Sequence, residues 1–139
     1  MSHFFSGLYT ALVTPFTISG EVDWNAFERM VNHQIDGEVD GIVLLGTTGE
    51  SSTLSPEEHL DALRKGIEIV DGRTQVIAGT GSNATSEAIR YSIEAQEAGA
   101  DGLLQVVPYY NKPTQKGLIE HFTAVADSVD IPILLYNIP

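Results

Sequence analysis

The fold of this 139-residue chain follows from the stretch Ile42-Val43-Leu44-Leu45-Gly46-Thr47-Thr48-Gly49-Glu50-Ser51. Its apolar first part is typical of a short β-strand that is buried on both faces. Two glycines then enclose a pair of threonines in a turn. In α/β proteins, ligands bind at the carboxyl ends of the strands. We therefore expect Thr47 and Thr48 to present their hydroxyls at a binding edge of the sheet.

The residues that follow predict a helix with a well-defined start. Ser55 can serve as the N-cap, Pro56 suits the first helical position, and Glu58 can close a capping box with Ser55. Apolar residues then recur three and four positions apart until Asp71-Gly72 ends the pattern. A strand followed directly by an amphipathic helix is one unit of a β/α protein.

Four more apolar runs have the length of strands: residues 8–14, 75–78, 103–107 and 131–136. Amphipathic helices are expected between them, one from Asp23 to Gly37, one over residues 84–98 and one carrying Leu118, Phe122, Val125 and Val129. The resulting order βαβαβαβαβ predicts a parallel sheet with crossover helices, so the fold class is α/β.

An open doubly wound sheet and a (β/α)8 barrel share this local pattern. Every unit is alike and no point of reversal is evident, which favours the barrel. A complete barrel has eight strands and typically about 250 residues. Five strands therefore predict a partial (β/α)8 TIM barrel, and we expect residues 1–139 to be the N-terminal part of a single barrel domain.

The composition excludes several classes of protein. There is no cysteine, which excludes disulfides, thiolate metal sites and a cysteine nucleophile. The formal net charge of −12 argues against binding to nucleic acid or to anionic membranes, because both need clustered positive charge. No apolar run approaches the roughly 20 residues that cross a bilayer, and no signal-peptide pattern is found, so we expect a cytoplasmic protein. An anionic ligand would need a local countercharge, because the overall field repels it.

Polar side chains follow every predicted strand. They are Thr14, Thr47, Thr48, Thr80, Asn83, Tyr109, Tyr110, Tyr136 and Asn137. Because phenol and hydroxyl groups both donate and accept hydrogen bonds, tyrosines and a threonine at one edge could relay protons. The alternative is that the tyrosines only cover the rim of the core with their amphipathic rings.

The remaining motifs favour structural roles. The segment that starts at Gly79 fits a loose dinucleotide-binding fingerprint, but a tight turn in which Asn83 or a neighbour caps a helix explains it better. The histidines are scattered without ligand spacing, so we expect no metal site. His33 and His121 are expected on helix surfaces, and His59 is either a solvated imidazole or close enough to a strand tip to reach a ligand.

Four motifs together resemble one family. They are Gly46-Thr47-Thr48-Gly49-Glu50-Ser51, Ile77-Ala78-Gly79-Thr80-Gly81, Pro108-Tyr109-Tyr110-Asn111-Lys112-Pro113 and Tyr136-Asn137-Ile138-Pro139. In this order they are similar to the N-terminal half of the dihydrodipicolinate synthase (4-hydroxy-tetrahydrodipicolinate synthase) family. The resemblance covers essentially the whole chain. The third motif favours this family over N-acetylneuraminate lyase and the keto-deoxy-sugar aldolases.

The resemblance implies a lyase built as a (β/α)8 barrel that acts in the diaminopimelate route to lysine. In such enzymes a lysine forms a Schiff base with pyruvate, and the resulting enamine attacks aspartate semialdehyde, without a metal or organic cofactor. By the matching motifs, Thr47 and Tyr136 would relay protons. Tyr110 would complete the relay from the neighbouring subunit of a homodimer or homotetramer, and Thr48 would hold the pyruvate carboxylate.

A feedback site for lysine is also implied by the resemblance. It maps onto Ser51, Ser52, His59, Asn83, Glu87 and Tyr109. Lysine-sensitive enteric members carry a histidine where this chain has Pro56. A proline cannot supply that side-chain contact, so we do not expect the feedback inhibition to carry over unchanged to this chain.

The family's Schiff-base lysine belongs to the sixth strand, which would lie beyond Pro139, and so does an arginine that binds the substrate carboxylate. Lys65 and Lys116 are expected on helices and Lys112 in a polar loop, so none has the buried setting of a nucleophilic lysine. We therefore expect these 139 residues alone to be inactive. The alternatives are another class I pyruvate aldolase, such as N-acetylneuraminate lyase, and a non-catalytic half-barrel that self-associates through exposed strand edges.

Overall fold

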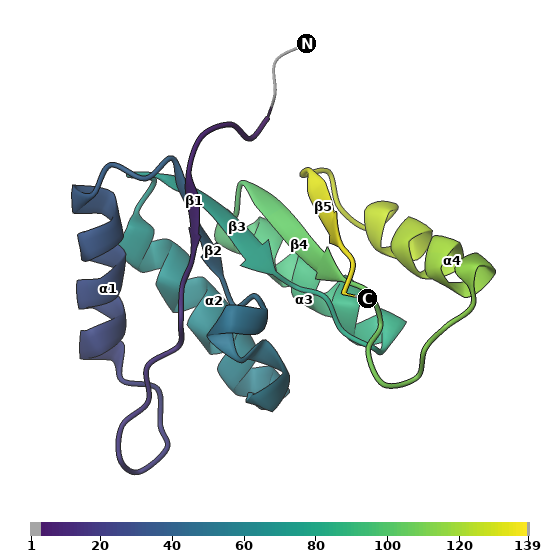
Figure 1. The fold of residues 1–139 in the computed structure, drawn as a ribbon, viewed down its shortest axis with the longest axis horizontal. Coiled ribbons are helices and arrows are strands. Elements are labelled where there is room, and N and C mark those ends of the chain that lie inside the picture. The colour runs from purple at the N-terminus through teal and green to yellow at the C-terminus, as the bar shows by residue number, and fades with distance from the viewer. Residues whose placement is uncertain (1–3, 139) are drawn as a thin grey trace.

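The structure is a computed structural model that describes residues 4–138, in which strands alternate with helices (Figure 1). Its strands and α-helices are β1 (Tyr9–Ala11), α1 (Trp24–Asp36), β2 (Gly41–Leu44), α2 (Pro56–Val70), β3 (Gln75–Gly79), α3 (Thr85–Ala98), β4 (Gly102–Val106), α4 (Gln115–Ala126) and β5 (Ile133–Tyr136). Two 3₁₀ turns, η1 (Thr47–Gly49) and η2 (Ser51–Thr53), connect β2 to α2. None of the helices within the described residues has the length and apolar character that a membrane span needs.

The predicted order of strands and helices is confirmed, although the ends of the elements differ by a few residues. The largest difference concerns the first strand, which the sequence predicts over residues 8–14. β1 ends at Ala11, because its pairing with β2 stops at Val43. The Leu12 N–H still donates to the Val43 carbonyl oxygen at 3.0 Å, but no further residues pair along β2.

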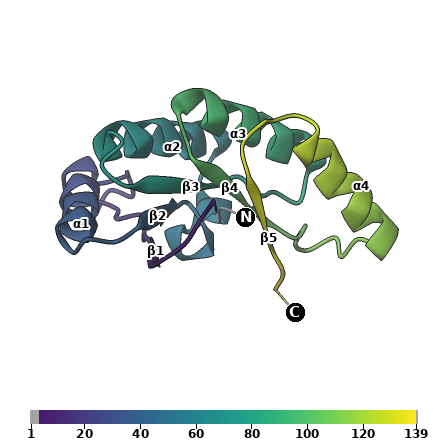
Figure 2. The same ribbon diagram turned by 90° about the horizontal axis from the view of Figure 1, so that it is seen from above.

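All five strands are parallel and form one sheet in the order β1-β2-β3-β4-β5. The four α-helices lie on the same face of this sheet, in an arc from α1 to α4 (Figure 2). A doubly wound sheet carries helices on both faces, whereas a barrel carries them only outside. The one-sided arrangement therefore confirms the partial barrel. The sheet is not closed, and β1 and β5 are its edges.

The hydrophobic core lies between the helices and the sheet. Ile42 and Leu44 of β2 are fully buried there, together with Phe27 of α1 and Leu63 of α2. Gly66 lets α2 approach β2 closely, because a Cβ at this position would lie 2.7 Å from Leu44 Cδ1. Removal of this apolar surface from water, at about 25 cal/mol per Å², is the main favourable term in folding.

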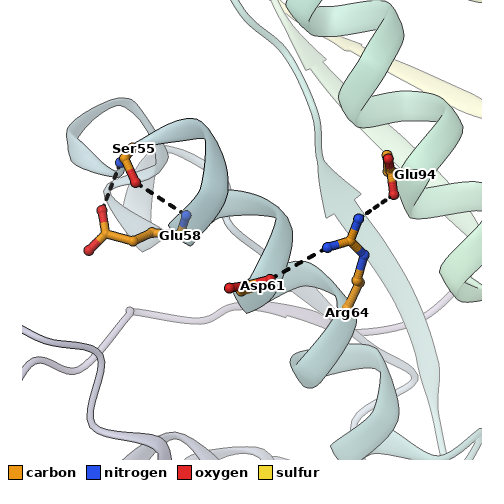
Figure 3. Close-up of polar contacts among 5 residues, drawn as sticks. All are labelled: Ser55, Glu58, Asp61, Arg64 and Glu94. Atoms are coloured by element: carbon orange, nitrogen blue, oxygen red, sulfur yellow. Dashed lines mark hydrogen bonds and ion pairs between the residues drawn. The ribbon is translucent and has the colours of Figure 1, made fainter.

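Both the start and the exposed side of α2 are fixed by polar contacts (Figure 3). The Ser55 N–H donates to Glu58 Oε2 at 2.8 Å, and the Glu58 N–H donates to Ser55 Oγ at 3.2 Å, which confirms the predicted capping box. Hydrogen bonding to the carboxylate from the Ser55 backbone N–H, and then from the Ser55 side chain, lowers the pKa of Glu58. Farther along the helix, Arg64 lies 3.4 Å from Asp61 of the same helix and 2.5 Å from Glu94 of α3, so one ion pair links the two helices.

His121 of α4 is buried against α3, and the prediction that it lies on the surface is wrong. Its side chain is 5% exposed, and its Nδ1 lies 2.9 Å from Thr85 Oγ1. Burial lowers the pKa of His121. The residue stands three positions after Leu118 and four before Val125, so helical geometry places it on the apolar stripe. His33 of α1 is exposed, as predicted.

Candidate functional site

The turn after β2 has an unusual backbone. Leu45 has φ +52° and Glu50 has φ +54°, a left-handed conformation that residues with a Cβ adopt rarely. Between them, Gly46 leads into η1, which carries Thr47 and Thr48. Conformations of this kind persist only where surrounding contacts hold them, and they concentrate at functional sites.

Three contacts hold this turn in place. Thr14 Oγ1 donates to the Gly49 carbonyl oxygen at 2.7 Å, and the Thr14 side chain is buried. Gly79, at the end of β3, lies so close to the turn that a Cβ there would be 2.0 Å from the Leu45 carbonyl oxygen. His59 of α2 places its Nε2 3.0 Å from the Gly79 carbonyl oxygen. The segment after β1 therefore holds the turn directly, β3 packs against it, and α2 supports this end of β3.

A cavity of about 720 Å³ opens beside the turn. Its polar wall residues come from the segments after β2, β4 and β5: Thr47, Ser51, Ser52, Tyr109, Tyr110, Lys112 and Asn137. A second cavity of about 20 Å³ shares Thr47 with the first and adds Tyr136. The structure thus brings Thr47, Tyr110 and Tyr136 to one edge of the sheet. Thr48 is exposed on the same turn but does not line the large cavity.

The loop between β4 and α4 is held much more loosely than the turn after β2. Tyr110 is 94% exposed and has φ +70°, and Lys112 has φ +44°. Asn111 connects the loop to its surroundings. Its N–H donates to the Tyr109 carbonyl oxygen at 2.9 Å, and its Nδ2 donates to the Asn83 carbonyl oxygen at 3.3 Å. The Tyr110 ring therefore projects into solvent, where it can meet a ligand or another subunit.

The groups available for chemistry at this edge are hydroxyls and one ammonium. Within residues 4–138, no three His, Asp or Glu side chains are arranged to hold a metal ion. Lys112 is the one charged residue, among those that the structure describes, that lines the large cavity. Threonine and tyrosine hydroxyls can pass protons, and an ammonium attracts anions. The edge is therefore suited to proton transfer on a small anionic molecule.

A further cavity of about 130 Å³, called the small cavity, shares Ser51, Ser52 and Tyr109 with the large one and reaches α2 and α3. It brings together five of the residues predicted for a lysine site: Ser51, Ser52, His59, Glu87 and Tyr109. Pro56 also lines this cavity. The sixth predicted residue, Asn83, does not line it, and its carbonyl oxygen accepts the Asn111 side-chain amide instead.

Sequence reasoning missed two residues of the small cavity, Ser82 and Tyr91. Ser82 Oγ donates to Glu87 Oε2 at 2.8 Å and fixes that carboxylate. The Ala84 N–H donates to Ser82 Oγ at 3.2 Å, but Ala84 is the N-cap of α3 and no side chain caps the helix, so the prediction that Asn83 or a neighbour caps it is wrong. Tyr91 stands four residues after Glu87 on the same helical face, and this spacing could have revealed it.

His59 is not a solvated imidazole, so this interpretation of the sequence is wrong. Its side chain is 2% exposed, and its ring stacks on Tyr91 with centroids 4.4 Å apart and planes 8° from parallel. Burial lowers the pKa of His59, against the opposing effects of the Gly79 and Ser51 backbone and the Glu87 carboxylate. The imidazole therefore acts as a neutral, fixed wall between the small cavity and the end of β3.

Thr80 follows β3 but does not face either cavity. It is fully buried with Ser92 of α3 and Gln105 of β4. Gln105 Nε2 donates to Thr80 Oγ1 at 2.6 Å and to Ser92 Oγ at 2.9 Å. These hydrogen bonds satisfy the hydroxyls of Thr80 and Ser92, which would be costly to bury alone. Of the polar residues that follow strands, Thr80 and Thr14 therefore have structural roles.

Comparisons with known proteins assign the chain to a family. The sequence profile of the dihydrodipicolinate synthetase family matches residues 4–139. The chain belongs to this family. A curated relative, the 4-hydroxy-tetrahydrodipicolinate synthase of Geobacter sulfurreducens, is 57% identical over 135 residues, which are 97% of this chain and 46% of the relative. The chain thus spans about half the length of the curated relatives that it matches.

Solved structures of family members superpose closely on the chain. The chloride-inhibited dihydrodipicolinate synthase of Acinetobacter baumannii, complexed with pyruvate, matches with a TM-score of 0.92 and 47% identity over 96% of this chain and 46% of that one. The family member of Cyanidioschyzon merolae, with lysine bound, matches with a TM-score of 0.93 and 48% identity over 99% of this chain and 47% of that one. The five-stranded sheet is therefore the N-terminal half of the barrel of this family.

Proposed function

We propose that residues 1–139 are the N-terminal part of a single (β/α)8 domain of a 4-hydroxy-tetrahydrodipicolinate synthase, which condenses pyruvate with aspartate semialdehyde. One observation carries the proposal. Thr47 lines a cavity of about 720 Å³ with Tyr110 and a cavity of about 20 Å³ with Tyr136, so the three hydroxyl groups of the expected relay share one edge. The 57% identity to a relative of that name supports the choice of substrates.

Each hydroxyl has a role in this proposal. Pyruvate, bound as a Schiff base to a lysine, must lose a proton from its methyl group before its enamine attacks the aldehyde. Thr47 and Tyr136 would move protons at the reacting atoms, because each can donate and accept. Tyr110 is almost fully exposed and would reach the relay of the neighbouring subunit in a homodimer or homotetramer. Thr48 would hold the pyruvate carboxylate through its hydroxyl or N–H.

The Schiff-base lysine would come from polypeptide outside these 139 residues. A nucleophilic lysine needs surroundings that favour the neutral amine, such as an apolar pocket. Lys65 lies 4.2 Å over the Trp24 ring and Lys116 lies 3.7 Å from Glu120, and both residues are exposed, so neither lies in an apolar pocket. Lys112 lies in an exposed loop. These surroundings support the expectation that the 139 residues alone form no Schiff base.

A condensation assay on the complete polypeptide that carries these residues tests the proposal. We expect turnover with pyruvate and aspartate semialdehyde, and little or none when N-acetylmannosamine replaces the aldehyde. Preference for the amino sugar would instead identify the chain as part of an N-acetylneuraminate lyase. Absence of turnover with either aldehyde would contradict both assignments.

We also propose that the cavity of about 130 Å³ is an effector site for lysine, in which the Glu87 carboxylate would pair with an amino group of the ligand. The lysine-bound relative from Cyanidioschyzon merolae supports this choice of ligand. Pro56 lines the cavity and offers no hydrogen-bonding side chain. The proposed effect is therefore weak binding of lysine and weak inhibition.

A second candidate function rests on the open sheet. Both edge strands, β1 and β5, leave backbone groups without a strand partner on one side, and such edges pair readily with other strands. A non-catalytic half-barrel would use them to self-associate or to bind another half. The mass in solution of residues 1–139 separates the candidates, since a well-behaved monomer would exclude this pairing.

A further inference from the structure

Four positively charged side chains among the described residues make contacts that lie away from the large cavity. Arg64 pairs with Asp61 within α2 and with Glu94 of α3, and Arg73 donates to carbonyl oxygens at the end of α2. Lys65 lies over an aromatic ring, and Lys116 pairs with a glutamate one helical turn away. Among residues 4–138, no carboxylate oxygen lies within 4.0 Å of Lys112 Nζ. Lys112 therefore carries an uncompensated positive charge in a chain whose net charge is −12.

Lys112 belongs to the loop between β4 and α4. Lys112 lines the large cavity together with Thr47 and Asn137, and it is the charged side chain there. Its backbone has φ +44°, a left-handed conformation that residues with a Cβ adopt rarely. The neighbouring Asn111 holds the loop through its hydrogen bonds to Tyr109 and Asn83. Lys112 thus lines the cavity from a backbone conformation that is unfavourable for a lysine.

We infer that Lys112 is the local countercharge that draws pyruvate into the catalytic cavity. This inference rests on the proposed function, in which pyruvate is the first substrate. Pyruvate carries one negative charge, so the field of a chain with a net charge of −12 repels it. A single cation at the mouth of a low-dielectric cavity reverses that field locally. Aspartate semialdehyde carries both an ammonium and a carboxylate, so its net charge is zero and the same cation attracts it less.

The two substrates should therefore respond differently to a change of charge at Lys112. Lys112→Met should lower kcat/KM for pyruvate about threefold at low ionic strength, and Lys112→Glu about tenfold, by analogy with other steered associations. The effect on kcat/KM for aspartate semialdehyde should be smaller. At 1 M salt the screening length is about 3 Å, so the variants should converge on the wild type. Lys112→Arg keeps the charge and should behave like the wild type.

Lys116 supplies the matched control. It is the same residue type, four positions away, but it does not line the cavity and it pairs with Glu120. The complete polypeptide and its K112M, K112E, K112R, K116M and K116E variants would be assayed at low and high salt. The inference predicts a salt-dependent loss with pyruvate at position 112 and none at position 116. Equal effects at both positions, or a loss at Lys112 that salt does not remove, would overturn it.

Pyruvate binding, measured by saturation-transfer NMR without the aldehyde, separates this inference from the proposed function. Weaker binding in K112E than in K116E at low salt supports the inference whether or not the protein turns over. A protein that binds pyruvate in this way but does not condense it would overturn only the proposed function. A protein that condenses pyruvate equally well in the wild type and in K112E would overturn only the inference.

Discussion

The turn after β2 and the loop after β4 both hold residues with a Cβ in the left-handed conformation, but they are held in different ways. Leu45 of the turn is 2% exposed, and buried contacts from Thr14 and Gly79 fix its surroundings. Tyr110 of the loop is 94% exposed, and the loop depends on the exposed Asn111. Changes in the turn should therefore alter both stability and the position of Thr47, whereas changes in the loop should alter function alone.

Gly79→Ala should have the largest effect on stability, because it places a Cβ where the Leu45 carbonyl oxygen now lies. The backbone of the turn would have to shift, at a cost of about 3 kcal/mol. Urea unfolding monitored by circular dichroism measures the loss. Gly117→Ala is the control, since its nearest contacts are 3.4 Å away and alanine favours the helix. Equal stability of the two variants would refute the tight contact at Gly79.

Thr47→Val should have the largest effect on activity. It removes the hydroxyl from an exposed position, so stability should hardly change while kcat falls about 100-fold, as expected for the loss of one proton-transfer group. Steady-state kinetics of the complete polypeptide measure this. Thr53→Val, on the same segment but outside the cavities described above, should keep its activity. A T47V enzyme with unchanged kcat would exclude Thr47 from the relay.

Thr14→Val should lower both the stability and the activity, the first less than Gly79→Ala and the second less than Thr47→Val. It keeps the shape of the side chain but leaves the buried Gly49 carbonyl oxygen without its 2.7 Å hydrogen bond. The expected loss is about 1–2 kcal/mol in the free energy of unfolding. Because the turn is loosened, kcat should also fall, although less than in T47V. A loss of stability with full activity would show that the turn does not need this anchor to position Thr47.

Pro56→His should change regulation and leave catalysis intact. A histidine in the small cavity can add one charge-assisted hydrogen bond to a lysine carboxylate, which is worth about tenfold in the inhibition constant. Lysine inhibition of the complete polypeptide, measured at fixed pyruvate, checks the change. No gain over Pro56→Ala would count against the assignment of this cavity to lysine.

His59 should make the stability of the folded chain sensitive to acid, and we expect this effect to be the smallest of those predicted for the variants above. Burial lowers the pKa of its folded form, so below the ordinary pKa of about 6.5 the unfolded chain binds a proton that the folded chain does not. Stability is therefore present above that pH and is lost as the pH falls towards the folded pKa. His59→Gln should reduce the loss between pH 7.5 and 5.5, whereas His33→Gln, at an exposed position, should not. Equal losses of stability in the two variants over this pH range would show that His59 is not the origin of the acid sensitivity.

Much of the fold follows from patterns along the sequence, because they report local geometry. Ser55 and Glu58 predict the start of α2, and the apolar run that begins at Ile42 predicts β2. Thr47 and Tyr136 could be placed at one edge, because all strands of a parallel sheet end on the same side. These features depend on neighbours within a few residues or on a rule of topology.

Features that depend on contacts between distant segments could not be predicted in this way. Nothing local distinguishes Thr14, which anchors a turn 35 residues away, from Thr47, which lines the cavity. The left-handed conformation of Leu45 is imposed by packing against Gly79 and contradicts the ordinary preference of leucine. The burial of His59 follows from its stack on Tyr91, a residue of another helix.

The central claim is that residues 1–139 supply the hydroxyl relay of a synthase whose Schiff-base lysine lies elsewhere. Mass spectrometry after incubation with pyruvate and reduction with borohydride tests it most directly, on residues 1–139 and on the complete polypeptide in parallel. The account predicts a pyruvyl adduct in the complete polypeptide alone, on a lysine outside residues 1–139. An adduct on Lys65, Lys112 or Lys116 would contradict it.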